Sequence, residues 1–322
     1  GSDPDDPKSG LIMTARLFAG LLLLLIVVVV AVFGPFLAPY DLWFQENIYY
    51  EEQDGERRLV VSPVAPSERH PLGTDIWGYD LLTILLHGAR YTILATIAIA
   101  ALRIVLAVAI VSAAPRPLRT APGGTGAHAA RRGGFRLLAG LPPFIIVYFL
   151  LYGFTFNPAV PPSVLALVQG VVIAVIGLPA LVPTVRGHLA EIAARDHVEA
   201  ARSVGAGNVR VLWRHILPLF IETMVVLFST EMVAVLTMLG QLGVFDVFMG
   251  GTIFQPSPPV FISISREWAG LIGQYRTYLS SSRWWLIVFP LAGYMVTLYG
   301  FYLLSRGLDE LFQRRYRKTS QL

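Results

Sequence analysis

The sequence predicts an all-α integral membrane protein with six transmembrane helices. Its 322 residues are 55% hydrophobic and only 14% charged, and the mean hydropathy is +0.61. Soluble domains carry about 25% charged residues, so the chain has too few charges for that class. Six separate stretches are long and apolar enough to cross a bilayer, and basic residues gather in alternate segments between them.

A helix needs about 20 mainly apolar residues to cross a hydrocarbon core of about 30 Å. The stretches that meet this requirement are residues 17–38, 91–113, 137–156, 163–185, 217–240 and 284–305. The first and the last contain no charged residue. We interpret 17–38 as an uncleaved first span, because it is too long for a typical signal peptide and no small-residue cleavage site follows it.

The distribution of arginine predicts the orientation of these spans. If the N-terminus is cytoplasmic, the inner segments are 114–136, 186–216 and the C-terminal tail, and each carries five basic residues. The outer segments include a long acidic loop and a loop 241–283 that has only three arginines. We therefore expect both termini in the cytoplasm.

The predicted organisation follows from these spans. It comprises a cytoplasmic segment 1–16, the first transmembrane helix 17–38, an extracytoplasmic loop 39–90, a five-helix core 91–305 containing a cytoplasmic loop 186–217, and a cytoplasmic tail 306–322.

One charged, helix-prone stretch interrupts the apolar second half, "DHVEAARSVGAGNVRVLWRHILP" from Asp196 to Pro218. Asp196 is placed to cap a helix that starts at His197. Gly205 and Gly207 allow a tight turn before a second helical run, Asn208–Ile216. Composition alone fits either a linker helix on the membrane surface or a short helix that docks into a partner.

This stretch resembles the EAA loop of ABC importer permeases. The match consists of Glu199-Ala200-Ala201, Gly205, and Leu217-Pro218 twelve residues after that glycine. His215 departs from the general consensus, but Arg-His-aliphatic-Leu-Pro is the form usual in the dipeptide/oligopeptide/nickel branch. In that family the loop forms the coupling helix that seats in a groove of the ATPase subunit. The resemblance therefore implies these ATPase-coupling residues: Glu199, Ala200, Ala201, Arg202, Ser203, Gly205, Leu217 and Pro218.

A second segment, "HPLGTDIWGYDLLTILLHGARYTI", resembles the signature of the same branch ahead of the second span. The matching positions are Gly73, Thr74, Asp75, Gly78, Asp80, Gly88, Ala89 and Arg90. Tyr79 stands where the branch commonly has arginine. The fifth span and the C-terminal block also match, with Ala269 and Ser305-Arg306 as departures. The resemblance covers about residues 17–315 and is closest to the C-type permease of the pair.

This resemblance implies a type I importer permease in a prokaryotic plasma (inner) membrane. The expected partners are a homologous second permease, two ATPase subunits, an extracytoplasmic solute-binding protein and the lipid bilayer, with no nucleic acid. The cargo implied is short peptides, with nickel or a metallophore as the alternative. ATP and Mg would bind the partner ATPases, and no cofactor is expected on this chain.

The sequence contains no set of residues typical of a catalytic or metal site. It has no cysteine, no paired histidines at metal-ligand spacing and no phosphate-binding glycine loop, so neither an enzyme activity nor a metal site is predicted. A stand-alone secondary transporter or channel remains a remote alternative; it would predict inverted internal repeats, and none is visible. An intramembrane enzyme is disfavoured.

Three polar residues inside the spans are candidates for the transport pathway: Glu231, Arg103 and Gln169. Ionisable groups at this depth are costly and usually face protein or a water-filled path. The alternative is that they bond neighbouring helices together.

Three outer segments also carry predictions. The acidic, Tyr-rich segment 41–56 is expected to form a cap or a receptor-docking surface, and Trp77–His87 to lie along the outer interface. Trp284-Trp285 is expected to belong to an interfacial aromatic belt.

Overall fold

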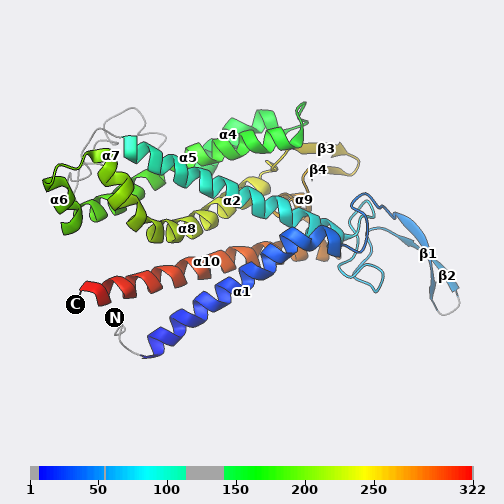
Figure 1. Cartoon of the computed structure of the whole chain (residues 1–322). Coiled ribbons are helices and arrows are strands. Elements are labelled where there is room, and N and C mark those ends of the chain that lie inside the picture. The colour runs from blue at the N-terminus through cyan, green and yellow to red at the C-terminus, as the bar shows by residue number, and fades with distance from the viewer. Residues whose placement is uncertain (1–6, 54–55, 114–140, 321–322) are drawn as a thin grey trace.

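The computed structural model describes residues 7–53, 56–113 and 141–320, and long helices dominate it (Figure 1). Five helices are long and apolar enough to cross a membrane. They are α1 (Pro7–Leu37), α2 (Leu81–Ala113), α5 (Pro162–Ala193), α8 (Leu217–Val244) and α10 (Trp285–Ser320).

The predicted third span, 137–156, corresponds to a shorter apolar helix, α4 (Pro143–Thr155). Its first residues lie outside the described part of the chain, as does the predicted inner loop 114–136. The described residues thus contain five candidate spans and one shorter apolar helix, and the six-span topology stays a prediction.

Several helices are longer than their predicted spans because hydropathy detects only the apolar part of a helix. Helix α2 begins at Leu81 rather than at residue 91, and α5 continues to Ala193. Residues 81–87 of the segment Trp77–His87 form the first turns of α2, and the interfacial position of that segment stays a prediction. Helix α1 likewise begins within the predicted segment 1–16, and α10 extends through the predicted tail to Ser320.

The fold is mostly helical, as predicted, but it is not all-α, because two antiparallel hairpins are present. One pairs β1 (Ile48–Gln53) with β2 (Glu56–Val61), and the other pairs β3 (Thr252–Pro256) with β4 (Pro259–Ser263). Both lie outside the candidate spans. An open strand edge is tolerated there because water is available to its backbone groups.

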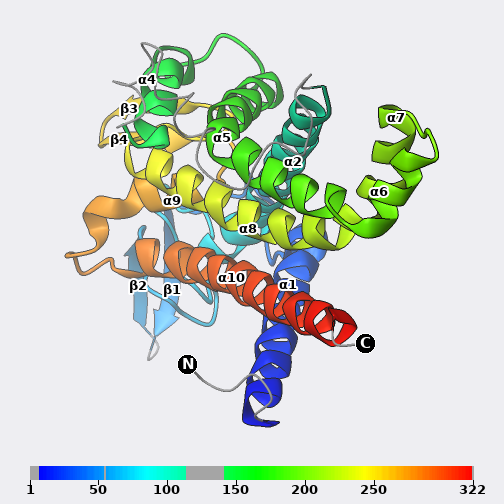
Figure 2. The same ribbon diagram turned by 90° about the vertical axis from the view of Figure 1, so that its left-hand side faces the viewer.

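The two ends of the bundle carry different structural elements. Both hairpins lie at one end, and the short helices α6 (Asp196–Ser203) and α7 (Asn208–Val211) lie at the other (Figure 1). Figure 2 looks at the bundle from the α6 end. Arg16 of α1 and Glu310 of α10 form an ion pair, with Nη1 2.6 Å from Oε1. Figure 1 shows that the start of α1 and the end of α10 lie at the same end of the bundle as α6.

The core consists of two buried apolar clusters. The larger joins α2, α8 and α10 to α9 (Trp268–Tyr275), a short and almost fully buried helix that precedes α10. The smaller joins the second halves of α2 and α5 to the α6–α8 segment and includes Val111, Leu189 and Phe220. The second cluster therefore connects the segment that resembles the EAA loop to the bundle.

Candidate functional site

The segment that resembles the EAA loop forms a helix–turn–helix at one end of the bundle. Helix α6 begins at Asp196, one residue earlier than predicted, and the N–H groups of Val198 and Glu199 bond Arg195 O at 2.9 and 3.2 Å. Helix α7 continues through a π-helical turn, Leu212–Ile216, into α8, which starts at Leu217-Pro218. Val198 and Val211 are 0% and 1% exposed and anchor the two short helices.

Gly205 ends α6 in a left-handed conformation, with φ +87°. Val204 N donates to Ala200 O at 3.2 Å, and Ala206 N donates to Ala201 O at 3.1 Å. The bond from Ala206 N to Ala201 O is the six-to-one bond of the Schellman motif, which favours glycine at the left-handed position. A Cβ at Gly205 would meet no atom within 4 Å, so the backbone conformation rather than crowding requires glycine here.

The outer surface of this segment is exposed and partly apolar. Val204, Val209 and Trp213 are 89%, 73% and 69% exposed, although hydrophobic side chains are normally buried. Glu199, Ala200 and Ser203 are exposed on the neighbouring helical turn. The small side chains of α6 leave room for another backbone to approach.

Two of the three candidate pathway residues form an ion pair inside the bundle. Arg103 Nη1 lies 3.0 Å from Glu231 Oε2, and Arg103 Nη2 donates to Ile173 O at 3.0 Å. The side chains are 4% and 14% exposed. A Cβ at Gly177 would lie 2.4 Å from the Arg103 guanidinium carbon, so glycine makes room for it. The pair joins α2, α5 and α8.

The third candidate, Gln169, is 1% exposed and bonded through both ends of its amide group. Its Nε2 donates to Phe248 O at 2.9 Å and to Thr155 Oγ1 at 3.2 Å, while its Oε1 accepts from Gly250 N at 2.8 Å. Gln169 therefore links α4 and α5 to the segment that follows α8.

At the other end of the bundle, Asp80 caps the start of α2. Its Oδ2 accepts from Thr83 N and Thr83 Oγ1, both at 2.8 Å. Its Oδ1 lies 3.0 Å from Nδ1 of the fully buried His70, whose Nε2 lies 3.8 Å from Glu46 Oε2. Asp80 thus helps to hold the preceding loop against the first turn of α2.

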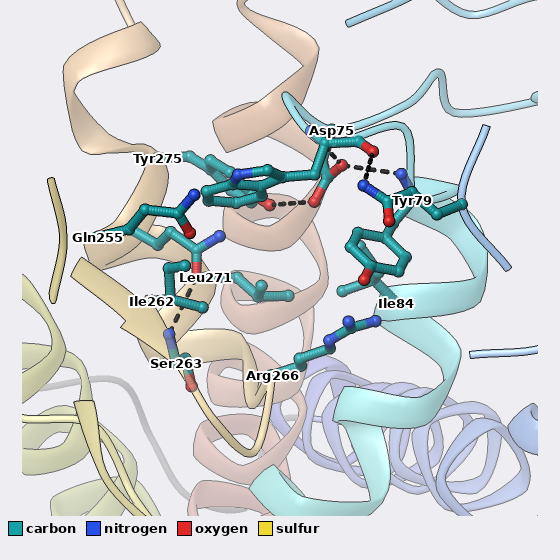
Figure 3. Close-up of a pocket in the computed structure, with 12 residues that line it drawn as sticks. Asp75, Tyr79, Ile84, Gln255, Ile262, Ser263, Arg266, Leu271 and Tyr275 are labelled. Atoms are coloured by element: carbon teal, nitrogen blue, oxygen red, sulfur yellow. Dashed lines mark hydrogen bonds between the residues drawn. The ribbon is translucent and has the colours of Figure 1, made fainter. Parts of the chain in front are cut away.

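Asp75 connects the same loop to α9. Its Oδ1 accepts from Trp77 N at 2.9 Å and Tyr79 N at 2.8 Å, and its Oδ2 accepts from Tyr275 OH at 3.2 Å (Figure 3). Burial raises the pKa of Asp75 to about 6, although these hydrogen bonds act in the opposite direction. Thr74 also helps to fix this loop, because its Oγ1 accepts a hydrogen bond from Val64 N at 2.8 Å.

The glycines of this signature are required by close contacts. Gly73 and Gly78 have φ +80° and +84°. Gly88 lies against another backbone, because a Cβ there would be 2.1 Å from Arg266 O. Ala89 is fully buried, whereas Arg90 is exposed. The residues of this signature therefore mainly hold the loop before α2 against α2 and α9.

His70, Arg266 and Tyr275 were not among the residues predicted from the sequence. His70 and Asp80 are 10 residues apart, so a buried pair in the signature was open to prediction. Tyr275 meets Asp75 across 200 residues, a distance that no local pattern encodes. Arg266 followed by Glu267 directly before the apolar α9 was a visible signal, since charges beside a buried helix need partners.

Apolar candidate spans, a buried ion pair between them and two structurally different ends define a multi-pass membrane protein. Residues 130–318 match the family described as binding-protein-dependent transport system inner membrane component. This is more than half of the chain, which therefore belongs to that family. Residues 17–54 match the N-terminal TM domain of oligopeptide transport permease C. The predictions of a transport subunit in the inner membrane and of an ABC importer permease are thereby confirmed.

Similar proteins include permeases of several peptide transport systems. The chain is 25% identical to a di/tripeptide transport system permease protein of Pseudomonas aeruginosa, over 94% of this chain and 88% of the relative. It is 25% identical to a dipeptide transport system permease protein of Bacillus subtilis, over 93% and 82%. It is 28% identical to a glutathione transport system permease protein of Escherichia coli, over 93% and 85%. Importers of this class generally work with ATPase and binding-protein partners.

Proposed function

We propose that this chain is one of two homologous permease subunits of an ATP-driven importer for short peptides. The names of the relatives, which refer to dipeptides, di/tripeptides and glutathione, favour peptide cargo over nickel or a metallophore. We further propose six spans with both termini cytoplasmic, the third span including α4. The arginine distribution supports this topology, as does the position of the α1 start and the α10 end at the same end of the bundle as α6.

The observation that carries the proposal is the exposed surface of α6 and α7. On the proposed topology it faces the cytoplasm, where two ATPase subunits would bind ATP and Mg. The residues from Glu199 to Gly205 would seat in an ATPase groove, with Val204, Val209 and Trp213 supplying apolar contact area. Leu217-Pro218 would transmit the motion directly into α8, because no loop intervenes between the π-helical turn and that helix.

Transmission of this kind needs contacts that differ between the inward-facing and outward-facing states. A rigid linkage from α6 into the bundle satisfies the mechanical part of the requirement. Val198 and Val211 are buried against the bundle, so a displacement of α6 acts on α5 and α8. A solute-binding protein would deliver cargo at the opposite end, near the hairpins.

The test places charges on the proposed ATPase-facing surface. Val204→Asp with Val209→Asp should abolish ATPase co-purification or peptide-stimulated ATP hydrolysis, because an apolar contact is replaced by two carboxylates. Val160→Asp is the matched control, since Val160 is 46% exposed in the turn at the opposite end. Normal coupling in the double variant would refute the assignment of the ATPase contact to α6 and α7.

For the intramembrane polar residues we propose an indirect role in the pathway. Arg103, Glu231 and Gln169 would bind neighbouring helices so that they move together. Their contacts within the chain support this role. Because part of the Glu231 side chain is exposed, Glu231→Gln also tests whether this residue contacts the pathway directly. Because Glu231→Gln alone leaves Arg103 without its carboxylate, transport is also measured in the double variant Arg103→Met, Glu231→Gln. A change in transport with assembly retained would support a pathway contact, whereas loss of assembly would indicate a purely structural role.

A further inference from the structure

A pocket of about 180 Å³ lies at the hairpin end of the bundle (Figure 3). It is formed by the loop before α2, the first turn of α2, the β3–β4 hairpin and α9. Its floor is buried and contains Asp75, Ile84, Leu271, Gln274 and Tyr275, whereas its rim is partly exposed. The rim residues include Gln45, Tyr79, Gln255, Ile262 and Arg266. The pocket is therefore open to solvent but has a preformed base.

Arg266 is the cation of this pocket, and its position is fixed. Its guanidinium carbon lies 4.4 Å from the ring centroid of Tyr79 and 5.2 Å from that of Trp43. Nη1 donates to Leu42 O at 2.9 Å. Among the described residues, no carboxylate lies within 4.0 Å of the guanidinium; Asp75 interacts with it electrostatically from farther away. The cation is thus held by rings and a carbonyl group.

The backbone of Arg266 is also unusual, with φ +54°. A left-handed conformation is costly for a residue other than glycine and is found more often at functional sites. Here the carbonyl of Arg266 lies against Gly88 and its N–H bonds Ser263 O at 3.3 Å. Two neighbouring elements therefore maintain the strained conformation that directs this side chain along the pocket.

The carboxylate of the pocket, Asp75, already accepts several hydrogen bonds from the protein itself. Asp75 accepts two backbone N–H groups and the Tyr275 hydroxyl, which disperse its charge. The remaining lining combines the amides of Gln255 and Gln274 with the apolar side chains of Ile84, Ile262 and Leu271. This lining suits a small group that has a charged end and an apolar branch.

We propose that the pocket binds the C-terminal residue of a short peptide, with Arg266 as the ligand of its carboxylate. The planar guanidinium fits a carboxylate through parallel N–H···O bonds. A cavity of about 150 Å³ holds one benzene molecule, so this pocket accommodates one residue rather than a whole peptide. The main-chain carboxylate is common to peptides of every sequence. The inference rests on the proposed function and adds a cargo contact to it.

The test compares L-alanyl-L-alanine with its C-terminal amide, which lacks the carboxylate. Binding of each to the purified transport complex without its solute-binding protein should favour the free acid by about tenfold or more, the worth of a hydrogen bond to a charged group. Arg266→Gln should abolish that preference by weakening free-acid binding, while amide binding is retained. Arg266→Lys should keep part of it. Arg283→Gln, an exposed arginine of the same outer segment, should behave as wild type.

Equal loss of both ligands in Arg266→Gln would show a structural role and overturn the proposal, as would an unchanged preference or no binding to the wild-type complex. A carboxylate on the solute-binding protein offers the same chemistry. If Arg266→Gln weakens docking of that protein but not dipeptide binding, the pocket belongs to the receptor and the proposal fails. Dipeptide uptake that persists in any of these cases would leave the proposed function standing, whereas no uptake by the wild-type complex would refute the function itself.

Discussion

The two ends of the bundle use glycine in opposite ways. At the hairpin end, a Cβ added to Gly73, Gly78 or Gly88 would lie 2.6 Å or less from a backbone oxygen of another segment. At the α6 end, Gly205 and Gly207 have nothing within 4 Å. The first region is tied internally by close contacts and buried hydrogen bonds, and the second presents an open surface. Residues that match a family motif can therefore serve the fold at one end and a partner at the other.

The largest effect on stability is expected at the ion pair between Arg103 and Glu231. Arg103→Met should lower stability by about 3–5 kcal/mol, because it leaves a carboxylate without its partner inside the bundle. Thermal unfolding of the detergent-purified chain measures the change. The double variant Arg103→Met, Glu231→Gln should recover part of the loss, since removing both charges costs less than removing one. A double variant as unstable as the single would contradict the pairing.

The next largest effect concerns Asp75 and depends on pH. Its pKa is raised from 3.8 to about 6 in the folded chain, so the unfolded chain loses its proton first as pH rises. Stability should therefore fall between about pH 4 and pH 6, by up to about 3 kcal/mol at 1.36 kcal/mol per pKa unit. Asp75→Asn should flatten that part of the profile and raise stability at pH 7.

Asp41→Asn is the matched control for this experiment. Asp41 makes the same kind of turn contact, with Trp43 N donating to its Oδ1 at 2.9 Å, but Asp41 is exposed. It should leave the pH profile of stability unchanged. An identical profile in Asp75→Asn and the wild type would show that Asp75 ionises normally.

A smaller effect is expected from Gly88→Ala, which places a Cβ 2.1 Å from Arg266 O. Backbone must shift to admit it, and overpacking of this kind costs about 1–3 kcal/mol. The midpoint of thermal unfolding should fall accordingly. Gly153→Ala in α4, where a Cβ meets nothing within 4 Å, should have no such effect. Equal stability of the two variants would contradict the close packing of α2 against the segment before α9.

How much of this was predictable depends on the range of the interactions. The apolar spans and the helix–turn–helix around Gly205 follow from local composition and were predicted, with helix ends misplaced where a helix continues beyond its predicted span. The hairpins were missed because their strands are only five or six residues long and show no strict alternation of apolar and polar residues. Asp75 and Gly88 were identified from a motif, but their partners Tyr275 and Arg266 lie nearly 200 residues away. Local patterns carry no information about such contacts.

The smallest change in stability is expected at Gly205, and it separates conformation from packing. Gly205→Ala must hold an L-residue at φ +87°, which costs about 1–2 kcal/mol, although the space around it is open. Because α6 is a surface helix, overall unfolding should change little. The end of α6 should instead shift and reduce peptide-stimulated ATP hydrolysis by about five- to thirtyfold, since each 1.4 kcal/mol corresponds to a factor of ten. Gly207→Ala has equally open space and, among the described residues, no positive φ, so it should hydrolyse ATP as the wild type does. Equal activity of both variants would mean that the left-handed turn at Gly205 is not needed for coupling, and the partner contact would then have to involve the exposed side chains alone.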